Sequence, residues 1–237
     1  MRISLWIAAF AASAVALAGC SSSSEPKKEQ PAAEAPAAAS TPAAAPQQEA
    51  APPQKQEAPA SPQAHAAGVS KVTFDTTKGP VVVEVHRDWA PIGADHFIKL
   101  VKSGYFDGCR FFRVVPNFIV QFGIAADPVV TRKWKEPPLT DDPMLQHNVR
   151  GTLVYAKTGA PNSRTTQLFI NLVDNTQSLD GQGFAPFGTV TSGMDAVDTI
   201  YPGYGEAPQQ PLIESQGNAY LQPQFPKLDY IRKATIQ

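Results

Sequence analysis

The sequence has little cysteine, little excess charge of either sign and none of the common catalytic signatures. Its 237 residues include 2 Cys, so a disulfide framework is excluded and stability must come from a hydrophobic core. Lys and Arg number 20 against 21 Asp and Glu, and this formal net charge of −1 argues against a nucleic-acid partner. The chain lacks a Gly-Lys-Ser/Thr phosphate loop, a Cys-X-X-Cys pair, a His-Glu-X-X-His motif and a Gly-X-Ser-X-Gly motif.

Metal and cofactor chemistry also has little support. Asp141 and Asp142 precede Pro143 in a polar loop, which is typical of turn chemistry rather than of a catalytic carboxylate pair. Cys109 stands in an apolar stretch and is expected to be buried and inert. The histidines lack metal-ligand spacing, and they are His65, His86, His96 and His147. We therefore expect neither a metal nor an organic cofactor.

The first residues have the layout of a secretory signal. Arg2 supplies a basic start, residues 3–16 form an apolar run too short to favour a membrane-spanning helix, and small residues follow. The ending Leu17-Ala18-Gly19-Cys20 resembles the bacterial lipobox. That resemblance implies a signal peptide over 1–19, lipidation of Cys20 and stable membrane anchoring. Ser21, by similarity to Gram-negative sorting patterns, favours the outer membrane facing the periplasm. The alternative is an ordinary signal peptide with an incidental cysteine.

Residues 20–68 are predicted to form a lipid-bearing, disordered linker. From 21 to 68 the chain holds 16 Ala and 9 Pro among its 48 residues, with no Phe, Trp, Tyr, Ile, Leu or Val. Such a segment cannot bury enough apolar surface to offset its ordering entropy. We interpret it as a tether, and a proline-rich ligand for a partner domain is the alternative.

Residues 69–237 are predicted to form one domain. Residues 71–76 and 80–86 indicate a β-hairpin, and 91–103 indicate an amphipathic helix that begins with Pro91 and ends at Gly104. Short strands are expected at 109–115, 118–121, 151–156, 167–172, 187–190 and 228–236, with a second helix at 194–200. Many short strands with two helices favour an antiparallel barrel or sandwich. The Pro-, Gln- and Gly-rich segment 201–226 has no assignable structure.

One stretch places a cation among apolar and aromatic residues. It is Phe111-Phe112-Arg113-Val114-Val115-Pro116-Asn117-Phe118-Ile119-Val120-Gln121. Read from strand alternation alone, Arg113 is equally well a surface residue whose stem covers the core. However, this stretch resembles the signature of the cyclophilin family of peptidyl-prolyl isomerases. Similar blocks recur in the family's order, at residues 90–108, 151–156, 161–163, 167–171 and 187–188.

The resemblance implies a closed, eight-stranded antiparallel barrel flanked by two helices, with the substrate groove on its outer face. It also implies that Arg113 is the catalytic residue. Substrate-binding residues by the same resemblance are Phe118, Ile119, Gln121, Gln167, Phe169, Leu179 and Phe184.

The expected function is peptidyl-prolyl cis-trans isomerisation of exported proteins, by a monomer in the cell envelope. Its partners would be proline-containing unfolded segments and, through the lipid, the membrane. The sequence departs from the family at Lys157, Thr158 and Ser178, after Gln121, and in the longer segments 125–148 and 201–226. A non-catalytic proline-peptide-binding or chaperone module therefore remains the alternative, and a structural spacer is a third reading.

Overall fold

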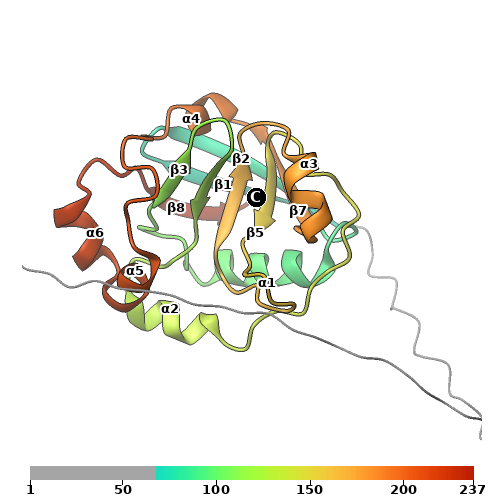
Figure 1. Cartoon of the computed structure of the whole chain (residues 1–237), viewed down its shortest axis with the longest axis horizontal. Coiled ribbons are helices and arrows are strands. Elements are labelled where there is room, and N and C mark those ends of the chain that lie inside the picture. Colours follow the sequence, from blue (N-terminus) through green and yellow to red (C-terminus); the bar gives the residue numbers. More distant parts are fainter. Residues whose placement is uncertain (1–67) are drawn as a thin grey trace, which may run out of the picture. The chain divides into compact units, whose positions relative to one another are not determined.

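The computed structural model describes residues 68–237, so the predicted signal peptide, the predicted lipidation site Cys20 and almost all of the predicted linker lie outside the described residues. The described part is built on one curled sheet of eight antiparallel strands (Figure 1). Their order across the sheet is β3-β4-β6-β5-β7-β2-β1-β8. The strands are β1 (Val69–Thr76), β2 (Gly79–His86), β3 (Arg113–Val115), β4 (Ile119–Phe122), β5 (Thr152–Tyr155), β6 (Leu168–Asn171), β7 (Pro186–Ser192) and β8 (Ile231–Ile236).

The predicted hairpin is confirmed. β1 and β2 pair antiparallel from Val69 opposite His86 to Thr76 opposite Gly79. The tight connection needs a positive φ of 121° at Gly79, which glycine adopts without a Cβ clash. Val72 and Phe74 face the core in alternation with half-buried or exposed residues, as the period of a half-buried strand requires.

The expected closure of the barrel is not shown. Strands β3 and β8 stand at the two ends of the sheet order, and within residues 68–237 no ladder joins them. The segment before β3 meets β8 through an isolated bridge between Arg110 and Tyr230, and Ile231 of β8 exchanges backbone hydrogen bonds with Gly108 and Cys109. The reason lies in β3, which has 3 residues where the sequence suggested a strand over 109–115. The sheet is therefore an open, curled half-barrel.

Within residues 68–237 the two expected helices are present, and four more accompany them. α1 (Pro91–Lys102) lies across one end of the curled sheet and α4 (Met194–Asp198) lies toward the other end (Figure 1). Residues 201–226, unassigned from sequence, hold two short helices. The four unexpected helices are α2 (Pro128–Lys135), α3 (Thr176–Leu179), α5 (Gln210–Gln216) and α6 (Asn218–Gln224), and a 3-10 turn follows α3 at Asp180–Gln182.

Side-chain alternation sorts the buried residues into a barrel core and two outer clusters. Residues such as Val120 and Ile170 point into the main core, which includes the edge-to-face phenylalanines Phe74, Phe106 and Phe122. A second cluster, formed by Ile119, Val154, Phe169 and Leu179, lies on the outer face of the sheet. A third cluster lies under α5 and α6 and consists of Phe112, Ile124, Ile213, Leu221 and Leu228. Across residues 68–237, no helix combines the length and the apolar character that crossing a bilayer requires.

Candidate active site

Strand register brings the predicted site residues into one row on the outer face of the sheet. Arg113 on β3 lies opposite Gln121 on β4, and Gln121 lies opposite Phe169 on β6. Phe169 in turn pairs with Val154 on β5. Because neighbouring residues along each strand point to the other face, Val114 and Val120 join the barrel core while Arg113 and Gln121 stay on the outer face.

The polar end of this row is a chain of hydrogen bonds. Arg113 Nη1 donates to Gln121 Oε1 at 3.2 Å, and Gln121 Nε2 donates to Gln167 Oε1 at 2.9 Å. The Gln121 side chain is buried, so these partners fix the direction of its amide. On its outer side, the guanidinium meets Glu206, with Nε and Nη2 lying 2.6 and 2.5 Å from Oε1.

The apolar end of the row is a pocket. Ile119, Val154, Phe169 and Leu179 form a buried cluster. Phe169 and Phe184 meet edge to face at 5.8 Å between ring centroids, and the Arg113 guanidinium carbon is 6.0 Å from the Phe118 ring centre. The resulting groove has a volume of about 880 Å³ and is lined by all eight predicted site residues, together with Ala156, Lys157 and Thr158. The arrangement places an apolar surface beside the charged hydrogen-bond donors of Arg113.

A buried amide network holds the pocket wall in place. Asn171 Nδ2 donates to Thr152 Oγ1 at 2.8 Å, and Asn175 Nδ2 donates to Asn171 Oδ1 at 2.7 Å. Asn148 Nδ2 donates to Asp180 Oδ1 at 2.7 Å and to the Phe184 carbonyl at 2.8 Å. Because α3 and the 3-10 turn carry Leu179 and lead to Phe184, this network positions the far wall of the groove.

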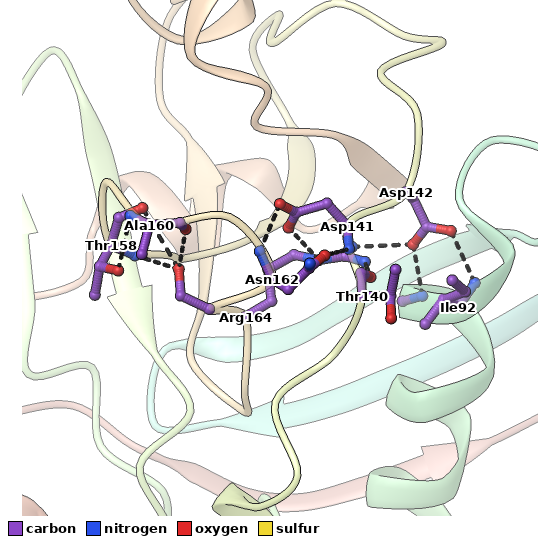
Figure 2. A network of polar contacts seen from close by, with 10 residues as sticks. Ile92, Thr140, Asp141, Asp142, Thr158, Ala160, Asn162 and Arg164 are labelled. Atoms are coloured by element: carbon purple, nitrogen blue, oxygen red, sulfur yellow. Dashed lines mark hydrogen bonds and ion pairs between the residues drawn. The ribbon is translucent and has the colours of Figure 1, made fainter.

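The carboxylates Asp141 and Asp142 do more than shape a turn, which corrects the sequence interpretation. Asp142 is buried and accepts the backbone N–H groups of Ile92 and Gly93, at 3.0 and 2.8 Å, at the start of α1 (Figure 2). It also accepts from Arg164 Nη1 at 3.0 Å, and Arg164 Nη2 donates to the Thr140 carbonyl.

This pairing joins the groove to α1. Arg164 is buried among acceptors, and Asp141 Oδ2 accepts the backbone N–H of Asn162 at 2.8 Å (Figure 2). The network therefore ties the loop of residues 156–165, which lines the groove, to the start of α1.

The remaining candidate groups lie apart from the groove and play structural roles. Burial raises the pKa of Cys109 to about 12, and its thiol donates to the Ile124 carbonyl at 3.1 Å, as the inert interpretation predicted. Burial and two nearby cations lower the pKa of His96 to about 4, and its ring contacts the Tyr155 hydroxyl at 3.2 Å. In the described part of the chain, no three His, Cys, Asp or Glu side chains gather as a metal site would require.

Sequence reasoning missed one whole wall of the groove. Glu206 and residues 208–211 line it from the C-terminal segment, and Lys135 Nζ of α2 pairs with Glu214 of α5 at 2.8 Å. From the sequence, the segments 125–148 and 201–226, which carry these residues, were recognised only as longer than the corresponding segments of the family. No local pattern in them points to Arg113, since the Arg113–Glu206 contact spans 93 positions of the chain.

Comparisons with known proteins agree with this geometry. Residues 71–215 match the family described as cyclophilin type peptidyl-prolyl cis-trans isomerase/CLD. A peptidyl-prolyl cis-trans isomerase of Acinetobacter baylyi is 35% identical over 159 residues, covering 63% of this chain and 85% of the relative. Peptidyl-prolyl cis-trans isomerase B of Escherichia coli K12 is 37% identical over 135 residues, covering 54% and 82%.

Solved structures show the same fold. The crystal structure of a cyclophilin-type isomerase from Cryptosporidium parvum matches with a TM-score of 0.53 and 23% identity, covering 72% of this chain and 98% of the other. A second structure of that protein was determined in the presence of the dipeptide Ala-Pro. The family match spans more than half of the sequence, so the chain belongs to the cyclophilin-type peptidyl-prolyl isomerases, and this is its enzyme class.

Proposed function

We propose that the chain isomerises X-Pro bonds of exported proteins in the cell envelope, with Arg113 as the catalytic residue. The observation that carries this proposal is the position of the Arg113 guanidinium beside the apolar pocket of Ile119, Phe169 and Leu179. The pocket suits a proline ring, and the guanidinium offers donors to the amide that leads into it.

Isomerisation is a rotation about the C–N bond of the X-Pro amide, so no covalent bond has to break. Amide resonance opposes rotation with a barrier of about 18–20 kcal/mol, and the prolyl nitrogen recovers its lone pair when the bond is twisted. A donor from Arg113 to that nitrogen binds the twisted state more strongly than the planar state, which lowers the barrier. Gln121 and Gln167 offer amide groups to the substrate backbone beside the pocket. No metal or organic cofactor enters this scheme.

Exchange NMR on a short Ala-X-Pro-Phe peptide tests the role of Arg113. We expect the full chain to accelerate cis/trans exchange and Arg113→Ala to lose most of that acceleration. A folded Arg113→Ala protein with undiminished activity would remove Arg113 from the catalytic role.

The envelope setting is the second element of the proposal. It rests on the lipobox-like Leu17-Ala18-Gly19-Cys20 and on the tether-like composition of residues 21–68. A lipid on Cys20 would hold the enzyme at the outer membrane as a monomer, free to meet unfolded chains in the periplasm. Isomerisation there would assist folding, because unfolded chains hold roughly 10–30% of X-Pro bonds as cis.

Metabolic labelling with an alkyne fatty acid tests this setting in a Gram-negative host. We expect label on the wild-type chain and recovery in the outer-membrane fraction, both lost in Cys20→Ala. An unlabelled wild-type chain found in the soluble periplasm would contradict the anchor while leaving the isomerase activity intact.

A proline-binding chaperone is the second candidate, and one observation favours it. Two of the five guanidinium N–H donors of Arg113 already form hydrogen bonds, to Glu206 and Gln121, and Nη2 lies in ion-pair contact with the same Glu206 oxygen. A groove that binds the peptide without changing its exchange rate would support this candidate.

A further inference from the structure

The C-terminal segment of residues 201–226 folds around an apolar cluster of its own. Ile213 of α5 and Leu221 of α6 are buried against Phe112 and Ile124, which flank the β3-β4 hairpin. Figure 1 shows α5 and α6 beside α2 at this edge of the sheet. Since Phe112 directly precedes Arg113, the segment is packed against the strand that carries the predicted catalytic side chain.

This cluster also fixes the loop that precedes α5. Tyr204 meets Tyr201 and Phe225 edge to face, at 5.2 and 5.1 Å between ring centroids. The Gly205 carbonyl accepts the backbone N–H of Val114 at 3.2 Å, so the loop runs beside β3. Glu206 is the next residue, and its backbone is therefore held close to Arg113.

The Glu206 side chain contacts the guanidinium from the outer wall of the groove. A single oxygen, Oε1, accepts a hydrogen bond from Arg113 Nε at 2.6 Å and lies 2.5 Å from Nη2 in the ion pair. Gln121 Oε1 accepts a hydrogen bond from Arg113 Nη1 on the inner side of the groove, at 3.2 Å. Among the described residues, the second N–H of Nη1 and the N–H groups of Nη2 form no hydrogen bond, and these can serve a substrate.

We propose that Glu206 is a positioning residue for Arg113, supplied by the C-terminal segment. The inference rests on the proposed catalytic role of Arg113. An arginine side chain has many rotamers, and with Gln121 alone as partner it would sample several orientations. Catalysis by a directed hydrogen bond requires one orientation, and a carboxylate across the Nε–Nη2 edge selects it. The Glu206 side chain is 65% exposed, so the pairing is modest in strength and removing it leaves no buried charge.

The test compares Glu206→Ala and Glu206→Gln with the wild type in the full chain. Asp195→Ala is the matched control, because it removes an exposed acid on α4 outside the groove. Exchange NMR on one X-Pro peptide gives kcat and KM, and thermal unfolding checks that each variant is folded. A second readout is the Arg113 Nε–H resonance in nitrogen-resolved NMR spectra, assigned by its absence in Arg113→Lys.

We expect Glu206→Ala to lower kcat about two- to fivefold with KM changed less than twofold. Glu206→Gln should keep part of that activity, because its amide oxygen can still accept from the guanidinium. The Nε–H resonance should exchange faster with water in Glu206→Ala and stay unchanged in Asp195→Ala.

Two outcomes would overturn the proposal. Unchanged kcat in Glu206→Ala would show that Gln121 alone orients the guanidinium. A rise in kcat/KM would show that the carboxylate competes with the substrate. If the wild type fails to accelerate exchange, the catalytic proposal itself fails, and the Nε–H resonance still reports whether Glu206 holds the guanidinium.

Discussion

Comparing Arg113→Ala with Arg113→Lys distinguishes the contribution of the planar guanidinium geometry from that of the positive charge. Alanine removes every donor. Lysine keeps a positive charge with three donors around one nitrogen, which cannot reach Gln121 and Glu206 from two sides and still face the prolyl nitrogen. We therefore expect the lysine variant to resemble the alanine variant more than the wild type.

The magnitude follows from the hydrogen bond that is lost. A hydrogen bond from a charged donor contributes about 1.5–3 kcal/mol, which is roughly ten- to a hundredfold in rate at about 1.4 kcal/mol per tenfold. The loss in stability should be about 1 kcal/mol, because the buried Gln121 Oε1 loses its donor, and two features limit the loss. Glu206 stays solvated when it loses its partner, and Gln121 keeps its hydrogen bond to Gln167.

The assay is two-dimensional exchange NMR on an Ala-X-Pro-Phe peptide, with kcat/KM measured at one temperature and unfolding followed in parallel. Arg113→Lys at wild-type activity would refute the argument that the fork geometry matters. Arg113→Ala at wild-type activity, in a protein that is folded at the assay temperature, would refute the role of the guanidinium altogether.

Three further changes test the pocket and its support. Phe118→Ala should lower kcat/KM about three- to tenfold in the same assay, because the ring lies under the guanidinium and borders the pocket; unchanged kinetics would place the proline elsewhere. Asp142→Ala should cost about 3 kcal/mol in urea unfolding, because it leaves the buried Arg164 with only the partly exposed Asp141 and the Thr140 carbonyl as partners; a cost below about 1 kcal/mol would contradict that reading. The free energy of unfolding should fall as pH drops from 6.5 to about 4, because over that range the unfolded chain protonates His96 and the folded chain does not; His96→Gln should flatten this part of the pH profile.

The inner half of the groove was predicted through the resemblance to the family, because strand alternation alone left Arg113 open between the groove and a surface position. Arg113 and Gln121 are eight positions apart on two strands joined by a tight turn, so their contact follows from register. Leu179 and Phe184 also line the groove, and their role in binding a substrate stays a prediction. Their support by Asn148 and its partners was not foreseen, because hydrogen bonds between distant loops leave no periodic pattern.

The outer wall of the groove, which the C-terminal segment forms, could not be predicted, because the composition of that segment gives no clear signal. Residues 201–226 are rich in Pro, Gln and Gly, so helix propensity and periodicity are weak there. Their few apolar side chains, including Ile213 and Leu221, become ordered only against a surface that the rest of the chain provides. The missing closure of the barrel has a similar cause, since alternation marks residues 109–115 as extended but does not show which of them find a partner strand.

The two partners of the guanidinium thus depend on different parts of the fold. Gln121 is held by the barrel, whereas Glu206 is held by the cluster around Tyr204 and Phe225. That outer cluster is small, so it should open at a lower free energy than the barrel core. Partial opening would release Glu206 from Arg113 while the pocket stays intact. Activity should therefore decline on heating before the barrel unfolds, and in Glu206→Ala this early decline should be absent.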